Sequence, residues 1–157
     1  MSNNKKGMER LSLHGEYEFQ KYVDGVYVGS EYIHNVVCLP IYYAVLKGLS
    51  GEAVQDISLT YFAFGTGTTT PTDADTTLTT EVFRKAVTSK GWNGKQFYSI
   101  CQLANNEANY SLKEVGVFSE GSLTADTGTL LSHALKDIEK NSNITYNVIY
   151  RLNMEEV

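Results

Sequence analysis

The residues whose types and spacing could bind a phosphate form the step Gly65-Thr66-Gly67, which ends the apolar run from Leu59 to Phe64. A dinucleotide-binding loop needs a third glycine and a following helix whose N-terminus faces the phosphates. Here three threonines and Pro71 follow, and Gly94-Lys95 lacks the earlier glycine and the Ser or Thr of a P-loop. The sequence therefore disfavours nucleotide binding and predicts a sharp exit of a strand into an ordered, threonine-lined loop.

Residues that could hold a metal ion are scattered along the chain. His14, His34 and His133 show no HxH or HxxxH spacing, so a zinc site has no cluster to build on. Asp73 and Asp75 resemble the start of a calcium loop, but the glycine and the later glutamate of that loop are missing. A loose cation site at these aspartates stays a minor alternative, and His133 is predicted to be a satisfied core or interface histidine.

Candidate catalytic residues are few. Cys38 and Cys101 lie outside any Cys-x-x-Cys spacing, which predicts two reduced, buried thiols. Catalytic carboxylates would have to come from Glu81 and Glu114, but Glu114 is predicted to share a strand face with apolar residues and to form a structural ion pair with Arg84. We expect no enzyme activity, no cofactor and no small-molecule substrate; a small hydrolase stays the alternative, since triads assemble in space.

The composition favours one soluble, β-rich domain. The chain has 157 residues, of which 42% are apolar and 20% charged, with eleven tyrosines and two prolines. Its net charge of −5 is unfavourable for nucleic acid, because Lys and Arg make the phosphate contacts. No apolar run reaches the roughly 18 residues that a membrane-spanning helix needs, and segment 1–10 shows no secretory signal. We therefore expect neither nucleic acid nor membrane as a partner.

Turn signals and alternation predict strands every 10–20 residues, with one helix between them. Asp24-Gly25 lies between two aromatic-rich runs and predicts an N-terminal β-hairpin. Residues 37–48 are apolar almost all round, which predicts one short helix buried against a sheet, with Asn35 as a candidate N-cap. The fold class is therefore mainly β, a single antiparallel β-sandwich or barrel-like domain. Four glycines are assigned to backbone geometry: Gly25, Gly65, Gly67 and Gly116.

Residues 1–14 are predicted to form an N-terminal arm, and residues 15–157 the β-rich domain. Lys5, Lys6 and Arg10 against Glu9 give the arm a local charge of +2, opposite in sign to that of the whole chain. The arm is either a disordered terminus or a segment that docks on an acidic surface of a neighbouring subunit.

Several motifs follow one another in a fixed order: Phe62-Ala63-Phe64-Gly65-Thr66-Gly67-Thr68, Leu78-Thr79-Thr80-Glu81-Val82-Phe83-Arg84, Glu114-Val115-Gly116-Val117-Phe118, Thr129-Leu130-Leu131, and the alternating segment 144–152. This order resembles that of small structural proteins of tailed bacteriophages, which are found in tails, collars, baseplates and fibre attachments. The resemblance spans roughly residues 15–153.

The resemblance implies a non-enzymatic virion protein, made in the cytoplasm of a bacterial host. It would be a multi-copy adaptor or connector that contacts copies of itself and other virion proteins. The side chains expected at subunit interfaces are Lys5, Lys6, Arg10, Thr66, Thr68, Thr69, Thr70 and Trp92. The alternative is a glycan- or capsid-binding module, a receptor-binding or decoration protein, in which Trp92 on an exposed turn would stack on a sugar.

Overall fold

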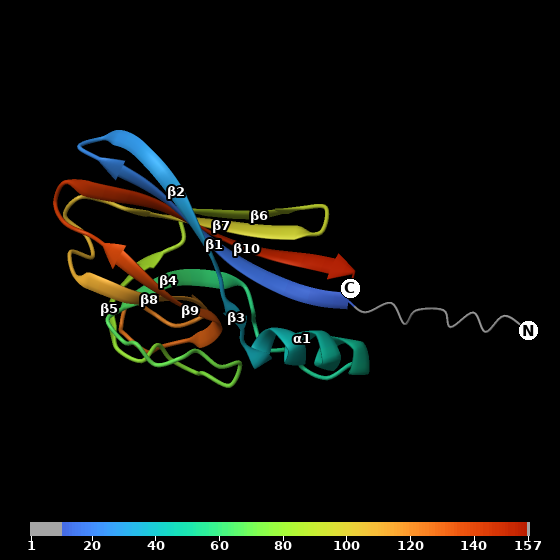
Figure 1. Ribbon diagram of the computed structural model, residues 1–157. Helices are drawn as coiled ribbons and strands as arrows, with labels where there is room; N and C mark the ends of the chain where they lie inside the picture. Colours follow the sequence, from blue (N-terminus) through green and yellow to red (C-terminus); the bar gives the residue numbers. More distant parts are fainter. Residues whose placement is uncertain (1–10, 157) are drawn as a thin grey trace, which may run out of the picture.

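The structure is a computed structural model, and it describes residues 11–156 as two antiparallel sheets packed face to face (Figure 1). Sheet A has the strand order β2-β1-β10-β7-β6, and sheet B has the order β3-β9-β8-β4-β5. The predicted mainly β sandwich with an N-terminal hairpin is confirmed. The elements are β1 (Leu11–Val23), β2 (Val26–His34), β3 (Val36–Val37), α1 (Leu39–Ser50), β4 (Leu59–Gly65), β5 (Glu81–Ala86), β6 (Ser89–Asn93), β7 (Gln96–Leu103), β8 (Ser111–Ser119), β9 (Thr129–Glu139) and β10 (Ile144–Glu156).

The main core lies between the two sheets. Because side chains alternate along a strand, Tyr17 and Phe19 of β1 point to the same face as Tyr150 of β10, which pairs with Tyr17. They meet Phe62 and Phe64 of β4, and all five side chains are buried. Each contributes about 1.5–3 kcal/mol by leaving water, so the sandwich holds its shape around this aromatic layer.

The hairpin between β1 and β2 has the turn that Asp24-Gly25 predicts. Both residues adopt positive φ, 48° at Asp24 and 80° at Gly25, as a two-residue hairpin turn of matching twist requires. The register shifts between Lys21 and Tyr22. Such a bulge bends an edge strand and discourages edge-to-edge pairing.

The predicted boundary of the arm at residue 14 is wrong. Leu11 pairs with Glu156 and His14 with Asn153, so residues 11–14 are part of β1. The reason is that β10 continues to Glu156 and offers hydrogen-bond partners along this whole stretch. Lys5, Lys6 and Arg10 lie outside the described residues.

The helix begins later than predicted, after Cys38, and ends at Gly51, whose φ is 75°. Asn35 is not its N-cap, because Val36–Val37 first pair with β9 as the short strand β3. The Asn35 side-chain amide instead donates to the carbonyl of Val36. The prediction of a buried helix is also wrong. Only Ile41 and Ala44 of α1 are buried, so the helix covers the molecule with one side and leaves apolar side chains in solvent.

Sheet A is longer than sheet B at the end where the helix lies. In Figure 1 the ends of β1 and β10 and the β6–β7 hairpin extend past sheet B, on the side of α1. We call the overhang the paired ends of β1 (residues 11–15) and β10 (residues 152–156) together with the β6–β7 hairpin (residues 91–97). Within the overhang Trp92 and Met154 are exposed, whereas Leu13, Phe97 and Leu152 are partly buried against the core.

Candidate functional site

The centre of the candidate site is the carboxylate of Glu114, on β8, which is fully buried. It accepts hydrogen bonds from three backbone amides, those of Gly67 (3.0 Å), Thr79 (2.9 Å) and Thr80 (2.7 Å). These amides lie near the two ends of the segment 66–80, which connects β4 to β5 and which we call the threonine loop. One carboxylate therefore fastens both ends of this loop to sheet B.

A histidine and a second carboxylate continue the network. His133, on the neighbouring strand β9, lies 2.8 Å from Glu114 through Nε2 and 2.8 Å from Asp75 through Nδ1, and it is 1% exposed. Asp75 belongs to the threonine loop and accepts hydrogen bonds from the Thr72 amide and hydroxyl. His133 thus bridges the middle of the loop to the carboxylate that holds its ends.

The contacts within this network set the protonation states. Burial opposes charge on Glu114, but the hydrogen bonds from His133 and the three amides outweigh it and lower the pKa of this carboxyl. Burial likewise opposes charge on Asp75, and the bonds from Thr72 and His133 lower its pKa. Desolvation would lower the pKa of His133, but the two carboxylates raise it. We therefore describe the network as an imidazolium held between two carboxylates.

The predicted ion pair between Arg84 and Glu114 is wrong. Arg84 forms a bidentate pair with Glu81, with distances of 2.5 Å from Nε and 2.9 Å from Nη2, and both side chains are 1% exposed. Strand order explains the error. Arg84 and Gly116 both pair with Ala63 of β4, so Glu114 lies in another row, where it and Glu81 flank Gly65. Glu114 does need compensation, as predicted, but backbone amides and His133 supply it.

Arg84 also holds a second loop. Its Nη1 donates to the carbonyls of Ser122 (3.0 Å) and Thr127 (2.8 Å), in the β8–β9 connection, and its guanidinium lies 4.5 Å from the ring centre of Phe118. A planar fork with five donors suits this combination of carboxylate, carbonyls and aromatic face. Arg84 and Glu81 therefore have a structural role, as an ion pair that orders a loop.

Three of the four singled-out glycines are required for space and not for unusual backbone angles. Gly25 has the positive φ expected of it, whereas Gly65, Gly67 and Gly116 do not belong to the positive-φ residues. A Cβ at Gly65 or Gly67 would collide with the carboxylate of Glu114, and one at Gly116 would press on the side chain of Leu78. Glycine is needed here because the threonine loop approaches the sheet so closely.

The remaining predicted site residues lie on the surface. The Thr66 amide donates to the carbonyl of Thr80 (2.9 Å), and its side chain is half-buried, while Thr68, Thr69 and Thr70 are exposed. Trp92 lies within β6 and not in the turn, which comes at Gly94, and its side chain is 78% exposed. Lys5, Lys6 and Arg10 fall on residues that the structure does not describe. A role of these residues at an interface stays a prediction.

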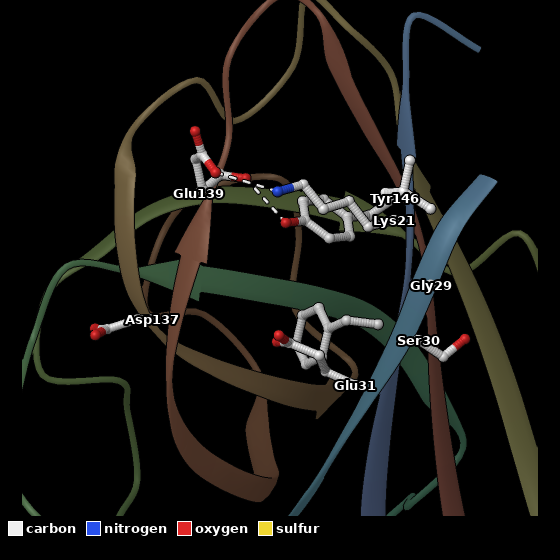
Figure 2. Close-up of a pocket in the computed structure, with 9 residues that line it drawn as sticks. Lys21, Gly29, Ser30, Glu31, Asp137, Glu139 and Tyr146 are labelled. Atoms are coloured by element: carbon white, nitrogen blue, oxygen red, sulfur yellow. Dashed lines mark hydrogen bonds and ion pairs between the residues drawn. The ribbon is translucent and has the colours of Figure 1, made fainter. Parts of the chain in front are cut away.

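A groove of about 370 Å³ opens between β2, at one edge of sheet A, and the C-terminal part of β9 (Figure 2). Figure 2 shows the Lys21 ammonium and the Tyr146 hydroxyl both directed at Glu139; they donate to its carboxylate (3.1 Å) and its carbonyl (3.0 Å). Glu31 pairs with Lys136, and Asp137 points away from the groove. The charged side chains that line the groove are thus engaged with other side chains, which gives no acid–base arrangement around a substrate.

The arrangement offers little for catalysis. Both ring nitrogens of His133 are engaged by carboxylates, so neither is directed at a nucleophile. Burial raises the pKa of the Cys38 and Cys101 thiols to about 12, so both are inert, buried thiols as predicted. Among residues 11–156, no group of three or more His, Cys, Asp or Glu side chains could hold a metal ion. No helix in this part of the chain is long and apolar enough to cross a membrane.

The motifs that follow one another in the sequence meet in space at this site. Gly67 comes from the first, Thr79 to Arg84 from the second, and Glu114 from the third. Sequence reasoning missed the link from Asp75 to His133, because the two are 58 residues apart and no spacing signals it. No protein-family model, curated protein or solved structure matches this chain.

The buried ion pair between Arg84 and Glu81 predicts that the two side chains are strongly coupled in their effect on the free energy of unfolding. We expect Arg84→Ala to lower the free energy of unfolding by about 3–5 kcal/mol, because it leaves the Glu81 carboxylate buried without its partner. Denaturant unfolding measures this, and Lys113→Ala, which breaks the exposed pair with Asp137, should cost no more than about 0.5 kcal/mol. In double-mutant cycles, Arg84 should couple to Glu81 more strongly than to Glu114. A stronger coupling to Glu114 would contradict the Arg84–Glu81 pair and support the Arg84–Glu114 pair predicted from the sequence.

The network also predicts a stability optimum in mildly acidic solution. Because the pKa of His133 is raised from 6.5, its stabilisation is complete below pH 6.5 and is lost as the pH rises through the raised value. Because the pKa of Glu114 is lowered from 4.5, its stabilisation is complete above pH 4.5 and is lost as the pH falls through the lowered value.

The thermal midpoint, followed by circular dichroism, should therefore be highest between about pH 4.5 and 6.5 and fall on the alkaline side. His133→Gln removes the titrating group, so this variant should be less stable but should lose the alkaline decline. Parallel profiles for the two proteins above pH 6.5 would contradict the assignment of the imidazolium.

Proposed function

We propose that this chain is a non-enzymatic structural protein of a tailed-bacteriophage virion. It is present in many copies, as an adaptor or connector of the tail, collar, baseplate or fibre base. The proposal rests on one observation: the charged residues of the motifs hold loops in place. The buried charges that these motifs contribute are engaged with one another and with backbone groups, and together they hold the threonine loop and the β8–β9 connection to sheet B.

This use of the motifs supports a protein that works through its surface. Glu114 and Glu81 face backbone amides, His133 and Arg84, and none of these groups is directed into the groove between the sheets. A fixed loop presents Thr68, Thr69 and Thr70 to solvent, where hydroxyls can form hydrogen bonds with little loss of side-chain freedom. Such loops suit contacts that are repeated in every copy of an assembly.

A second candidate function is a glycan-binding module, and the exposure of Trp92 favours it. Its indole lies on β6, close to the β6–β7 turn, and is 78% exposed. An exposed indole offers a flat apolar face on which a sugar ring can stack. The same exposure also suits a subunit contact, because tryptophan is enriched at interfaces between proteins.

The composition of purified particles tests the virion proposal. We expect mass spectrometry of gradient-purified phage from the producing culture to detect this chain at a constant ratio to the major capsid protein, and in several copies per particle. A host cytoplasmic protein of similar abundance in the lysate serves as the control and should disappear on purification. Loss of the chain along with that control would overturn the proposal.

A glycan array separates the two candidate functions. We expect the purified protein to bind no glycan, because the structural proposal gives Trp92 a protein partner. Trp92→Ala and Tyr110→Ala, which alters another exposed aromatic residue, are the matched variants. Binding by the wild type that is lost in Trp92→Ala and kept in Tyr110→Ala would favour the glycan-binding module.

A further inference from the structure

Helix α1 carries an apolar stripe that nothing in the described chain covers. Tyr42, Val45, Leu46 and Leu49 follow the spacing i, i+3, i+4, i+7, so they lie along one side of the helix. They are 39% to 83% exposed. Ile41 and Ala44, on the neighbouring side, already anchor the helix to the molecule. The apolar side chains of the stripe are therefore not needed to hold the helix on the molecule.

The overhang of sheet A adds apolar side chains beside this stripe. Tyr42 lines a hollow of about 380 Å³ together with Leu13 and Val37, which places this end of the stripe against β1. Leu13 pairs with Met154, and Trp92 pairs with Phe97, which in turn pairs with Leu152. By alternation these side chains lie on the same face of sheet A as Tyr17, and this face is the one that extends over α1 in Figure 1.

The exposed area suits a stable interface. A large apolar or aromatic side chain at these exposures presents roughly 100–200 Å². The stripe with Trp92 and Met154 therefore exposes on the order of 800 Å², which equals one side of a standard protein–protein interface. A monomeric protein rarely exposes a contiguous apolar patch of more than a few hundred Å². The surface thus has the size of an interface that one further protein chain would fill.

The apolar character of this surface suits a second copy of this chain. In a two-fold symmetric pair the same patch meets itself, and an apolar stripe without charges is complementary to its own copy. Lys47 is the charged residue of α1. It comes five residues after Tyr42, about 140° around the helix from it, so it lies outside the stripe and leaves the meeting surfaces free of charge.

We propose that two copies of this protein associate through the α1 stripe as a two-fold symmetric pair, with the overhangs closing over the contact. This inference rests on the proposed function in one respect, the premise that the protein works in many copies, and it names the surface through which they meet. In this arrangement Trp92 lies at the margin of the contact, which agrees with its prediction from the sequence as an interface residue.

Sedimentation velocity on the full-length protein over a wide range of concentrations tests this proposal. The wild type should be a dimer. Leu46→Glu should weaken the dimer by about tenfold or more, because each partner would bury an unpaired carboxylate at the centre of the stripe. Val26→Glu is the matched control: Val26 is 64% exposed, against 62% for Leu46, but it lies in the β1–β2 hairpin. This control should dimerise as the wild type does.

One further measurement distinguishes a weakened dimer from a chain that no longer folds. The thermal midpoint of each variant at the lowest concentration shows whether the monomer is still folded, and both variants should match the wild-type monomer.

A wild-type protein that is monomeric at every concentration would overturn the proposal, even if the chain is found in virions, because the stripe would then belong to another partner. A dimer that Leu46→Glu does not weaken would overturn it as well. A stripe-dependent dimer with no chain in purified virions would support this inference and overturn the proposed function. The two proposals can therefore fail separately.

Discussion

The burial of the Glu114 carboxylate is the constraint on which the outer side of sheet B depends. A buried ion costs several kcal/mol unless its remaining lone pairs are satisfied, and here three amides and His133 satisfy them. The amides belong to the threonine loop, so the charge cannot be stable without the loop, and the loop is held in place by the charge. Gly65 and Gly67 follow from the same requirement, since any side chain there would occupy the space of the carboxylate.

The sequence was sufficient for features that depend on neighbouring residues. The Asp24-Gly25 turn and the alternation of 144–152 each predict a structure through local geometry, and both were found in the expected place. It was not sufficient for features that depend on strand order. That Glu114 needed a compensating charge was clear from its strand face, but the partner was not, because Arg84 and Glu114 lie on strands separated by β4 and in different rows.

Helix α1 shows a different limit. A segment that is apolar almost all round is typical of a buried helix, yet only Ile41 and Ala44 are buried in this chain. The sequence shows how much of the helix surface is apolar, but not whether this surface packs against the same chain or against another one. The wrong prediction of burial and the excess of exposed apolar surface are therefore one observation, and the proposed second copy would account for both.

In this protein, several charged side chains are buried and paired, whereas several apolar side chains are exposed to solvent. The buried charges around the threonine loop and the β8–β9 connection are closed on one another: Arg84 with Glu81, and His133 with Glu114 and Asp75. Its apolar side chains are in part open, along α1 and the overhang. An enzyme needs charged groups directed at a substrate, whereas an assembly needs rigid loops and uncovered apolar faces. The charges fix the loops while the apolar stripe stays exposed, an arrangement that suits the proposed association with other chains better than catalysis.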